Sequence, residues 1–507
     1  MKSGAKLTII KLAATAVLFA IFVITGLIDL DKDVINPDSI NWHERTLAFS
    51  KALKEKDYSK TFQTYHPGTT LMWISSTAVN QATKENFLHQ DYLAKLSVLI
   101  FTSMLFLLMT VILWKLVNFK YALFFSCIFS LEPFLLGSRR LYHLDFLMTV
   151  LLFLSFLLVG YFNYKSAQTK ALVLAGLFFA LALLTKSTAI IMAPITVLMF
   201  ILGNPAFKKK VLGFAVFTCS GLLFFYVFFP PIWTDPLKLI PKYVQKIVFG
   251  VETIGLAGRL ELENAILDET IAKQPADFYI KSLAMRISVG TGIMLLVGAA
   301  VFTFMFFKKL KFHYSPAAWV SLWSILFSIL VIVILSVATK KIDRYLIIVF
   351  PFLLTLIAYF LCKLRPLAAV GVFALYVGVL IAELLVTHPY YIAYSNPLLG
   401  DIRVRLYTLD DSPFGIATYT AVKAVLDDTQ GKFYTIAGSK SVKAIAIGGK
   451  FSRAPSCVTD YVIIYVKDIE PIYVCRQKYT LLNTVKVADY DYWYIFKRLN
   501  QRHQKNN

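Results

Sequence analysis

Long apolar runs dominate this sequence, and they restrict the chain to a fold that crosses a membrane. A transmembrane helix needs roughly 20 mostly apolar residues, and runs of about that length occur at eleven places along the chain. They lie near residues 8–28, 92–116, 120–137, 146–162, 171–185, 188–202, 211–230, 287–307, 317–338, 345–361 and 367–387. With a mean hydropathy of +0.65 and only 16% charged residues, the chain is too apolar for an ordinary soluble domain. We therefore expect an α-helical polytopic membrane protein with about eleven transmembrane helices.

Lysine and arginine in the short loops predict the orientation of these spans, because positively charged loops resist translocation. If the N-terminus is cytoplasmic, the loops on that side include residues 115–120, 164–170 and 208–210, and all of them are basic. No convincing cleavage site follows the first run, so we expect a retained anchor rather than a removed signal peptide. The odd number of spans then places the C-terminal region outside. The sequence predicts a multi-pass protein of the cell membrane with a cytoplasmic N-terminus and an extracytoplasmic C-terminal domain.

Two segments on the predicted outside face are too long to be simple connectors. Residues 29–91 contain NWHERTLAFSKALKEKD, whose apolar residues recur near helical spacing, and we expect an amphipathic helix at the interface. Residues 231–286 form the second long loop. We therefore divide the chain into a transmembrane domain over 1–390 and an extracytoplasmic domain over 391–507. In the latter, a helix near 412–428 and the β-rich runs KFYTIAG, DYVIIYVK, NTVKVAD and DYWYIFKR predict a small α/β fold.

The net charge and the cysteines exclude fewer classes of function than the hydropathy does. The net charge of +22 is partly the topology signal and partly attraction to an anionic membrane surface, so we do not interpret it as nucleic-acid binding. No Walker loop, HExxH, CxxC pair or glycine-rich dinucleotide fingerprint occurs in the sequence. Cys457 and Cys475 lie in the exported region, where a disulfide is permitted, and their pairing stays open.

Several cations lie in very short outside loops, against the bias that sets the orientation. A charge near the hydrocarbon costs about 2.5 to 3.5 kcal/mol at the bilayer centre and less at its edge, so it persists where it has a partner or a function. These side chains either snorkel to lipid phosphates or bind a substrate phosphate at membrane depth, which the arginine fork suits. The cations are Arg139, Arg140, Lys186, Lys340, Lys341 and Arg344.

Carboxylates occur on the same predicted face. Asp235 before a proline reads as a turn residue, and Asp343 beside Arg344 reads as one half of a local pair. Asp145 begins a span, with His143 two residues before it, and Asp38 lies where the first span leads into the amphipathic helix. A half-buried carboxylate near an acceptor hydroxyl is what general-base catalysis needs. Asp38 and Asp145 are therefore the candidate catalytic residues.

Seven strings of residues in order resemble the GT-C-fold, polyprenyl-phosphate-dependent glycosyltransferases. The likeness is to bacterial members related to protein O-mannosyltransferases, of the glycosyltransferase family 39 type, and to the lipid A aminoarabinose transferases. It covers most of the membrane region. The strings are NPDSINWHERTLAF, YHPGTTLMW, EPFLLGSRRLYHLDFLM, LLTKSTAIIMAP, PPIWTDP, KKIDRYLIIVFP and HPYYIAYSNPLLG.

The resemblance implies an enzyme that takes a sugar from a polyprenyl phosphate carrier on the outer face and transfers it to an acceptor with inversion. Asp38 matches the first-loop aspartate of the family and would be the base or would position the acceptor, and Asp145 matches the second-loop aspartate. Relatives often carry an acidic pair in the first loop, whereas here Ser39 follows Asp38 and Glu44 lies one turn further on. Arg139 or Arg140, Lys186 and Arg344 would hold the carrier phosphate, and the further substrate-binding candidates are His143, Asp343, His66 and Glu44.

The implied partners are a polyprenyl-phosphate-linked hexose or pentose, a protein, lipid or glycan acceptor, and membrane lipids. Some relatives bind a divalent metal near their carboxylates, but no ligand cluster here has persuasive spacing, and no metal ligand is predicted. A lipid or glycan transporter or flippase is the main alternative, and a scaffold without catalysis is the second. Carriers usually place charges or broken helices near the membrane midplane. The charges here gather at span ends on one side, which favours an enzyme.

Overall fold

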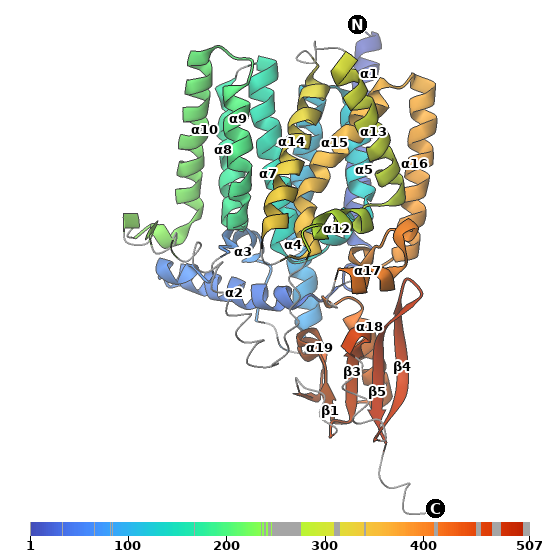
Figure 1. The fold of residues 1–507 in the computed structure, drawn as a ribbon. Helices are drawn as coiled ribbons and strands as arrows, with labels where there is room; N and C mark the ends of the chain where they lie inside the picture. Colours follow the sequence, from blue (N-terminus) through green and yellow to red (C-terminus); the bar gives the residue numbers. More distant parts are fainter. Residues whose placement is uncertain are drawn as a thin grey trace, which may run out of the picture.

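The computed structural model describes residues 2–237 except 33, 65, 82, 84, 167 and 235, then residues 240, 241 and 245, and the ranges 275–308, 315–338, 341–409, 414–452, 458–468 and 478–499. A helical bundle carries a small sheet domain at one end (Figure 1). The α-helices are α1 (Lys2–Leu27), α2 (Pro37–Lys54), α3 (Thr69–Ser75), α4 (Phe87–Leu116), α5 (Phe119–Leu131), α6 (Pro133–Arg139), α7 (Leu144–Tyr161), α8 (Thr169–Thr185), α9 (Ala193–Ile201), α10 (Phe207–Phe228), α12 (Phe278–Arg286), α13 (Val289–Lys308), α14 (Pro316–Val337), α15 (Phe350–Lys363), α16 (Pro366–Thr387), α17 (Ile402–Thr408), α18 (Thr418–Thr429) and α19 (Lys440–Ile445). The strands are β1 (Tyr434–Ala437), β2 (Gly449–Ser452), β3 (Tyr461–Tyr465), β4 (Tyr479–Val487) and β5 (Tyr490–Arg498).

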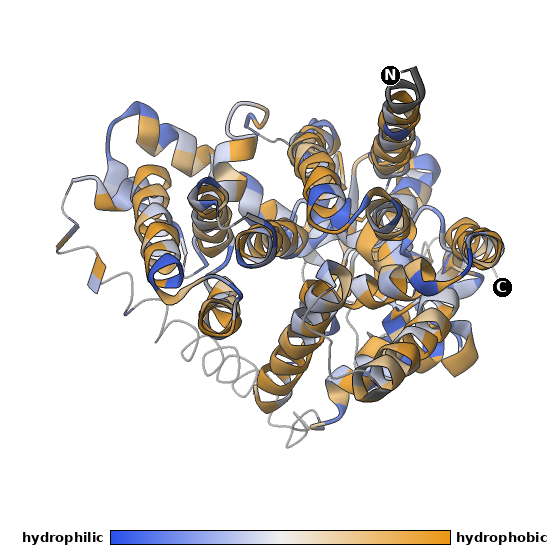
Figure 2. Cartoon of the chain, turned by 90° about the horizontal axis from the view of Figure 1, so that it is seen from above, coloured by the Kyte–Doolittle hydropathy of each residue, from blue (hydrophilic) through white to orange (hydrophobic). Residues whose placement is uncertain are grey.

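Helices occupy all eleven of the apolar runs. Among the described residues, seven helices are long and apolar enough to cross a membrane, and two bent pairs, α5 with α6 and α12 with α13, raise the number to nine. The remaining two runs form the shorter apolar helices Thr169–Thr185 and Ser187–Ile201. The helices of the bundle consist mostly of apolar residues (Figure 2), and many of their large apolar side chains are exposed on the outer faces. The prediction of a polytopic helical membrane protein is confirmed, with seven to nine spans by length.

Helix α7 is surrounded by other helices. Its sequence, LDFLMTVLLFLSFLLVGY, is apolar on every side, and a helix of that kind is stable only where protein or lipid encloses it completely. It packs against α4, α8 and α15, and 94% of its spanning window is buried. Its first turn carries Asp145 and opens at the end of the bundle that adjoins the sheet domain (Figure 1). A carboxylate is thereby brought into the middle of the bundle end.

The two bent helix pairs are joined at their breaks. Helices α5 and α6 meet at 69° beside Glu132, and α12 and α13 meet at 116°. The Glu132 carboxylate accepts hydrogen bonds from the backbone N–H of Ser288 (2.9 Å), the Ser288 hydroxyl (3.0 Å) and the Thr291 hydroxyl. Glu383 of α16 accepts the next backbone N–H, that of Val289, at 2.9 Å. The first N–H groups of a helix lack partners within it, so these carboxylates satisfy the start of α13.

The helix predicted in the first long loop, residues 29–91, is present as α2. Helix α2 lies across the end of the bundle, and α3 follows it (Figure 1). Asn36 caps α2 by accepting the backbone N–H of Ser39 at 2.7 Å, and Pro37 occupies the first helical position. The second outside loop, residues 231–286, lies largely outside the described residues, as does Asp235. Its last part is helix α12.

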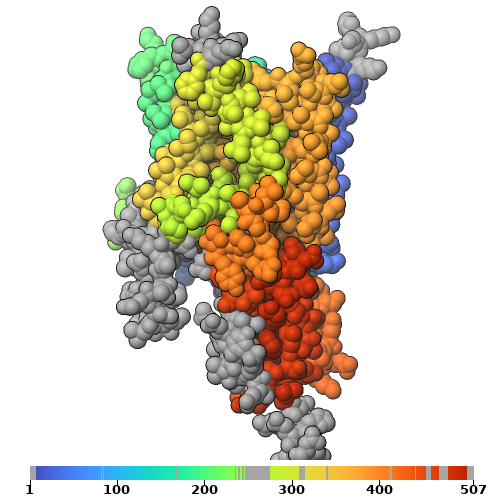
Figure 3. Space-filling model, turned by 45° about the vertical axis from the view of Figure 1, so that its right-hand side comes forward, coloured from blue at the N-terminus to red at the C-terminus, as the bar shows by residue number. Residues whose placement is uncertain are grey.

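The C-terminal region forms a five-stranded sheet in the order β2-β1-β3-β5-β4. Strand β1 pairs in parallel with β2 and β3, while β3, β5 and β4 pair antiparallel. The four predicted β-rich runs correspond to β1, β3, β4 and β5, and the predicted helix corresponds to α18; β2 was not predicted. The sheet domain is in direct contact with the bundle (Figure 3). Cys457 and Cys475 lie outside the described residues, so their pairing stays open.

Candidate active site

Five charged side chains from four parts of the chain meet at the bundle end that adjoins the sheet domain. Asp38 comes from the first turn of α2, His143 caps α7, and Asp145 lies in its first turn. Lys186 ends α8, and Arg344 lies in the 3-10 helix η6 (Asp343–Val349). All five were predicted from the sequence. We call them the charged cluster.

Asp38 is the more exposed carboxylate of the charged cluster, with 37% of its side chain accessible. Its Oδ2 atom lies 3.2 Å from Nε2 of His143 and 3.0 Å from Nη2 of Arg344. Burial raises the pKa of Asp38, but the hydrogen bond to His143 and the positive charges of His143 and Arg344 outweigh it. The pKa is therefore lowered from its ordinary value of 3.8, and Asp38 is ionised at neutral pH.

Asp145 is the buried carboxylate and is surrounded by cations. Lys186 Nζ lies 2.6 Å from its Oδ1 atom, while His143 Nδ1 (3.3 Å) and Arg344 Nε (3.7 Å) approach Oδ2. Only 7% of the Asp145 side chain is accessible. A buried carboxylate is retained in its ionised form when it is paired in this way. The Asp145 carboxylate therefore brings Lys186, His143 and Arg344 close to one another.

His143 links the two carboxylates and fits the site in either protonation state. When neutral, its Nδ1 accepts the backbone N–H of Asp145 at 3.3 Å and its Nε2 donates to Asp38. When protonated, Nδ1 donates to the Asp145 carboxylate instead. Burial lowers the pKa of His143, but the charge of Asp145 and the hydrogen bonds to Asp145 and Asp38 raise it above 6.5 overall.

The raised pKa of His143 predicts how stability changes with pH. A group whose pKa rises on folding stabilises the fold below its unfolded pKa, and the contribution is lost as the pH passes upward through the folded pKa. We expect the thermal unfolding midpoint in detergent to fall as the pH is raised above 6.5, and this fall should be absent in His143→Gln. The control is His89→Gln, at an exposed position on α4. An unchanged pH profile in His143→Gln would contradict the assignment.

The segment around the predicted residue His66 fixes the position of Lys186. The backbone N–H of Gly68 donates to the carbonyl of Thr185 at 3.1 Å, and His66 Nδ1 lies 3.2 Å from the Ser187 hydroxyl. These contacts hold the residues on both sides of Lys186. Gly68 has φ +60°, and a Cβ there would lie 2.1 Å from the Trp42 ring, so glycine is required. His66 therefore supports the charged cluster from beside it.

The predicted residue Asp343 positions the cluster and is itself held by an arginine. Its carboxylate accepts hydrogen bonds from Nε of Arg286 at 2.6 Å and from a second nitrogen of the same guanidinium. It also accepts a hydrogen bond from the backbone N–H of Arg344 at 2.7 Å. Arg286 also donates to the carbonyls of Ile392 (2.8 Å) and Tyr394 (3.0 Å). Arg286 was missed, although it is one more cation at the outer end of a span. The pair fixes η6 and with it Arg344.

The structure does not bring the remaining predicted residues into the charged cluster. Arg139 donates to the Thr25 hydroxyl at 2.8 Å and stacks over the Phe22 ring, and Arg140 donates to the carbonyls of Thr25 (3.1 Å) and Ile28 (2.6 Å). Both therefore hold the C-terminal end of α1. Arginine is favourable there because the last carbonyls of a helix lack partners and carry a partial negative charge. Glu44 is exposed on α2.

A buried trio that sequence reasoning missed supports Asp38 from behind. Lys95 Nζ lies 2.6 Å from Asp91 and donates to the carbonyl of Val34 at 3.0 Å, four residues before Asp38. His43, on α2, lies 3.5 Å from Asp91. All three side chains are buried. They tie the loop before α2 and the helix itself to α4, so that Asp38 is held from both sides. An i, i+4 acid and lysine at the start of a span was the signal available in the sequence.

The described residues do not fit a resident divalent metal. No group of three His, Cys, Asp or Glu side chains in the described part of the chain is placed to hold one. The two carboxylates of the charged cluster already face His143, Lys186 and Arg344, which supply the positive charge a metal would bring. No step is therefore assigned to a metal.

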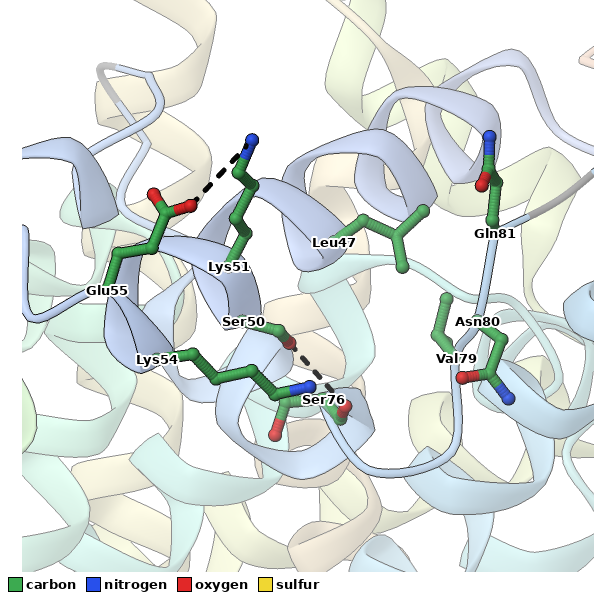
Figure 4. A pocket seen from close by; sticks show the side chains of 9 residues that line it. All are labelled: Leu47, Ser50, Lys51, Lys54, Glu55, Ser76, Val79, Asn80 and Gln81. Atoms are coloured by element: carbon green, nitrogen blue, oxygen red, sulfur yellow. Dashed lines mark hydrogen bonds and ion pairs between the residues drawn. The ribbon is translucent and has the colours of Figure 1, made fainter.

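One open cleft lies elsewhere on α2, with a volume of about 330 Å³. It is bounded by the C-terminal half of α2 and by the segment that follows α3 (Figure 4). The lining residues are Leu47, Ser50, Lys51, Lys54, Glu55, Ser76, Val79, Asn80 and Gln81. The first of them lies nine residues beyond Asp38, or roughly 13 Å along the helix. The charged cluster is therefore separate from this cleft.

The bundle with its broken helices, the crossing first loop and the small α/β domain define a polytopic membrane protein of the GT-C fold. No protein-family model matches the sequence, and no curated protein matches it. The solved structure of ArnT from Cupriavidus metallidurans in the apo state is similar over 98% of this chain and 98% of that chain, with a TM-score of 0.52 and 11% sequence identity. The predicted GT-C fold is therefore confirmed at the level of the fold.

Two further solved structures have lower TM-scores. ArnT bound to undecaprenyl phosphate gives a TM-score of 0.48 at 11% identity, over 96% of this chain and 98% of that chain. The apo form of the oligosaccharyltransferase from Archaeoglobus fulgidus gives 0.49 at 12% identity, over 92% of this chain and 70% of that chain.

Proposed function

We propose that the protein is a membrane glycosyltransferase that moves a sugar from a polyprenyl phosphate carrier to an acceptor on the extracytoplasmic face. The observation that carries the proposal is the charged cluster. A half-exposed ionised carboxylate, Asp38, lies 3.0 Å from the guanidinium of Arg344, and both lie where a bundle of the GT-C fold meets its outer domain. Such a pair can remove a proton from an acceptor and stabilise a departing phosphate at the same place.

The proposed reaction exchanges one carbon–oxygen bond for another and transfers one proton. The acceptor oxygen attacks the anomeric carbon of the sugar, its proton passes to Asp38, and the bond from that carbon to the phosphate oxygen breaks. The electron pair leaves with the polyprenyl phosphate, and the anomeric centre inverts. A general base of this kind contributes typically about 10²–10⁴ in rate. Asp38 is ionised at neutral pH and can therefore accept the proton.

Arg344 is the cation best placed for the departing phosphate. One fifth of its side chain is accessible, and its Nε makes no hydrogen bond within the described residues. Lys186 is buried and bound to Asp145, so it contributes mainly through its charge. Donors that are already oriented stabilise a developing charge without reorganising when the reaction occurs. We propose that Arg139 and Arg140 do not contact the carrier phosphate and contribute only by fixing the position of α1.

The carrier and acceptor classes are proposed from the sequence resemblance. ArnT has been solved with undecaprenyl phosphate, and the Archaeoglobus fulgidus enzyme with a tethered acceptor peptide. For this chain we propose a polyprenyl-phosphate-linked hexose or pentose as donor and a protein, lipid or glycan as acceptor. A site on the outer face reaches such acceptors because the sheet domain and the charged cluster lie at the same end of the bundle (Figure 1). We propose accordingly that the N-terminus is cytoplasmic.

Release of polyprenyl phosphate in detergent tests the proposal against a transporter. Micelles have no second compartment, so consumption of a labelled polyprenyl-phospho-sugar with release of the carrier phosphate must be catalytic. Wild-type protein is expected to release it, and Arg344→Ala to reduce the rate by about 10²–10³-fold. The matched control is Arg403→Ala, an exposed arginine paired with Asp401, which should retain the rate. Wild-type protein that binds but never cleaves such donors would contradict the proposal.

A further inference from the structure

The C-terminal domain places an aromatic ring directly on the charged cluster. The ring of Phe414 lies 4.3 Å from the guanidinium carbon of Arg344, which is a cation–π distance. The same ring meets the imidazole of His143 edge to face, with centroids 6.2 Å apart at 77°. Phe414 is half-buried and lies 70 residues after Arg344 in the sequence. No motif pointed to it.

The segment that carries Phe414 is fixed at two points. The carbonyl of Gly415 accepts the backbone N–H of Ile35 at 3.2 Å, three residues before Asp38. The next carbonyl, that of Ile416, accepts Nε1 of the buried Trp493 on β5 at 2.7 Å. Two consecutive carbonyl groups of this segment are therefore hydrogen-bonded. The first bonds to the loop before Asp38, and the second bonds to the sheet of the C-terminal domain.

The backbone conformation of this segment allows little freedom. Phe414, Gly415 and Ala417 have φ values of 43°, 77° and 56°. Left-handed conformations of residues other than glycine persist only where the surroundings determine them. A Cβ on Gly415 would lie 1.8 Å from the carbonyl oxygen of Ile35, so only glycine permits this approach. The ring of Phe414 is therefore held in place by the docking of the domain.

We propose that Phe414 is a positioning residue that orients the Arg344 guanidinium for the reaction. The ring packs against the guanidinium, with its centroid 4.3 Å from the guanidinium carbon, while Nη2 and Nε of the same group lie toward Asp38 and Asp145. Contact with the ring excludes water from that side of the cation, which strengthens its electrostatic interactions. The C-terminal domain thus supplies part of the active site. This inference rests on the proposed function only for its effect on turnover.

Three variants separate positioning from simple space filling. Phe414→Leu keeps an apolar side chain but removes the aromatic face, whereas Phe414→Tyr keeps the ring. Both carry the same left-handed backbone cost as phenylalanine, so strain does not distinguish them. Phe433→Leu is the control, because Phe433 lies in the same domain with its side chain 76% exposed. Thermal unfolding of the full chain in detergent verifies that each variant is folded.

The first readout is independent of catalysis. Phenylglyoxal modifies accessible guanidinium groups, and peptide mass spectrometry reports the rate at each arginine. Arg403, exposed, and Arg139, buried, provide fast and slow internal references. Arg344 is expected to be modified several-fold faster in Phe414→Leu than in wild type, with the rates at both references unchanged. Phe414→Tyr and Phe433→Leu should match wild type. An unchanged rate at Arg344 in Phe414→Leu would overturn the inference.

The second readout is turnover of the polyprenyl-phospho-sugar. A small misplacement of a catalytic group can cost on the order of 10- to 100-fold in rate. We expect kcat to fall by about 10-fold in Phe414→Leu with KM little changed, and Phe414→Tyr to restore it. Unchanged kcat in Phe414→Leu would overturn the role in catalysis. If Arg344 labelling changes as expected while wild-type protein cleaves no donor, the positioning stands and the proposed function fails.

Discussion

Replacing Asp38 by asparagine is expected to reduce release of polyprenyl phosphate by about 10²–10⁴-fold, the range typical of a lost general base. Asparagine has nearly the same shape and can still accept the hydrogen bond from Arg344, but it cannot take a proton from the acceptor. Binding of the donor should change much less than its turnover. The proposal for Asp38 therefore predicts an effect on kcat.

The matched control for this variant is Asp57→Asn. Asp57 lies in the same outside loop and forms an exposed pair with Lys60 at 2.6 Å, so its loss should leave turnover unchanged. The unfolding midpoint of Asp38→Asn should fall much less than that of Asp145→Asn, because Asp38 is the more exposed carboxylate of the charged cluster. Wild-type turnover in Asp38→Asn would remove Asp38 as the base and leave the fold assignment intact.

Asp145→Asn is expected to abolish turnover and to destabilise the protein as well. Asparagine leaves the buried Lys186 without a carboxylate, and loss of one partner of a buried pair typically costs about 3–5 kcal/mol. His143 and Arg344 lose the same partner. We expect a large fall in the unfolding midpoint in detergent. This result would separate Asp145 from Asp38, whose loss affects mainly the rate.

A double variant tests the cause of that destabilisation. Asp145→Asn with Lys186→Gln removes the lone cation, so it should recover much of the unfolding midpoint that Asp145→Asn loses, while turnover stays absent. Asp401→Asn, in an exposed pair with Arg403, is the control and should change neither property. A double variant that is less stable than Asp145→Asn would show that the pair is not the source of the effect.

The members of the charged cluster could be predicted from the sequence because they are charged residues beside long apolar runs. Asp145 and Lys186 lie at the ends of apolar runs, where a charge is costly, so each one had to have a partner. Which cations would be those partners could not be derived in this way. Arg139 and Arg140 satisfied the same criterion as Lys186, but the end of α6 directs them toward α1. The direction of a side chain at a helix end depends on how the helices pack, and the neighbouring residues in the sequence do not determine that packing.

The contributions of distant segments could not be predicted at all. Arg286 follows a long loop, and nothing local indicates that its partner is Asp343, 57 positions later. Phe414 is one of 42 phenylalanines, and its contact with Arg344 exists only because the sheet domain docks on the loop before Asp38. Hydropathy and charge identify residues that need explanation. They do not identify an apolar residue whose role depends on tertiary docking.

The charge balance of the cluster bears on product release. With His143 protonated, three cations face two carboxylates, which leaves one positive charge in surplus. The proposed donor, a polyprenyl-phospho-sugar, is a phosphodiester with a single negative charge, and it would make the charged cluster neutral. The leaving carrier is a phosphomonoester, which bears about 1.5 to 2 negative charges at neutral pH. In the proposed reaction Asp38 takes up a proton, so two positive charges are in surplus while the carrier phosphate is still bound. Once Asp38 releases that proton, only one surplus positive charge remains, and the uncompensated negative charge of the phosphomonoester favours its departure into the bilayer.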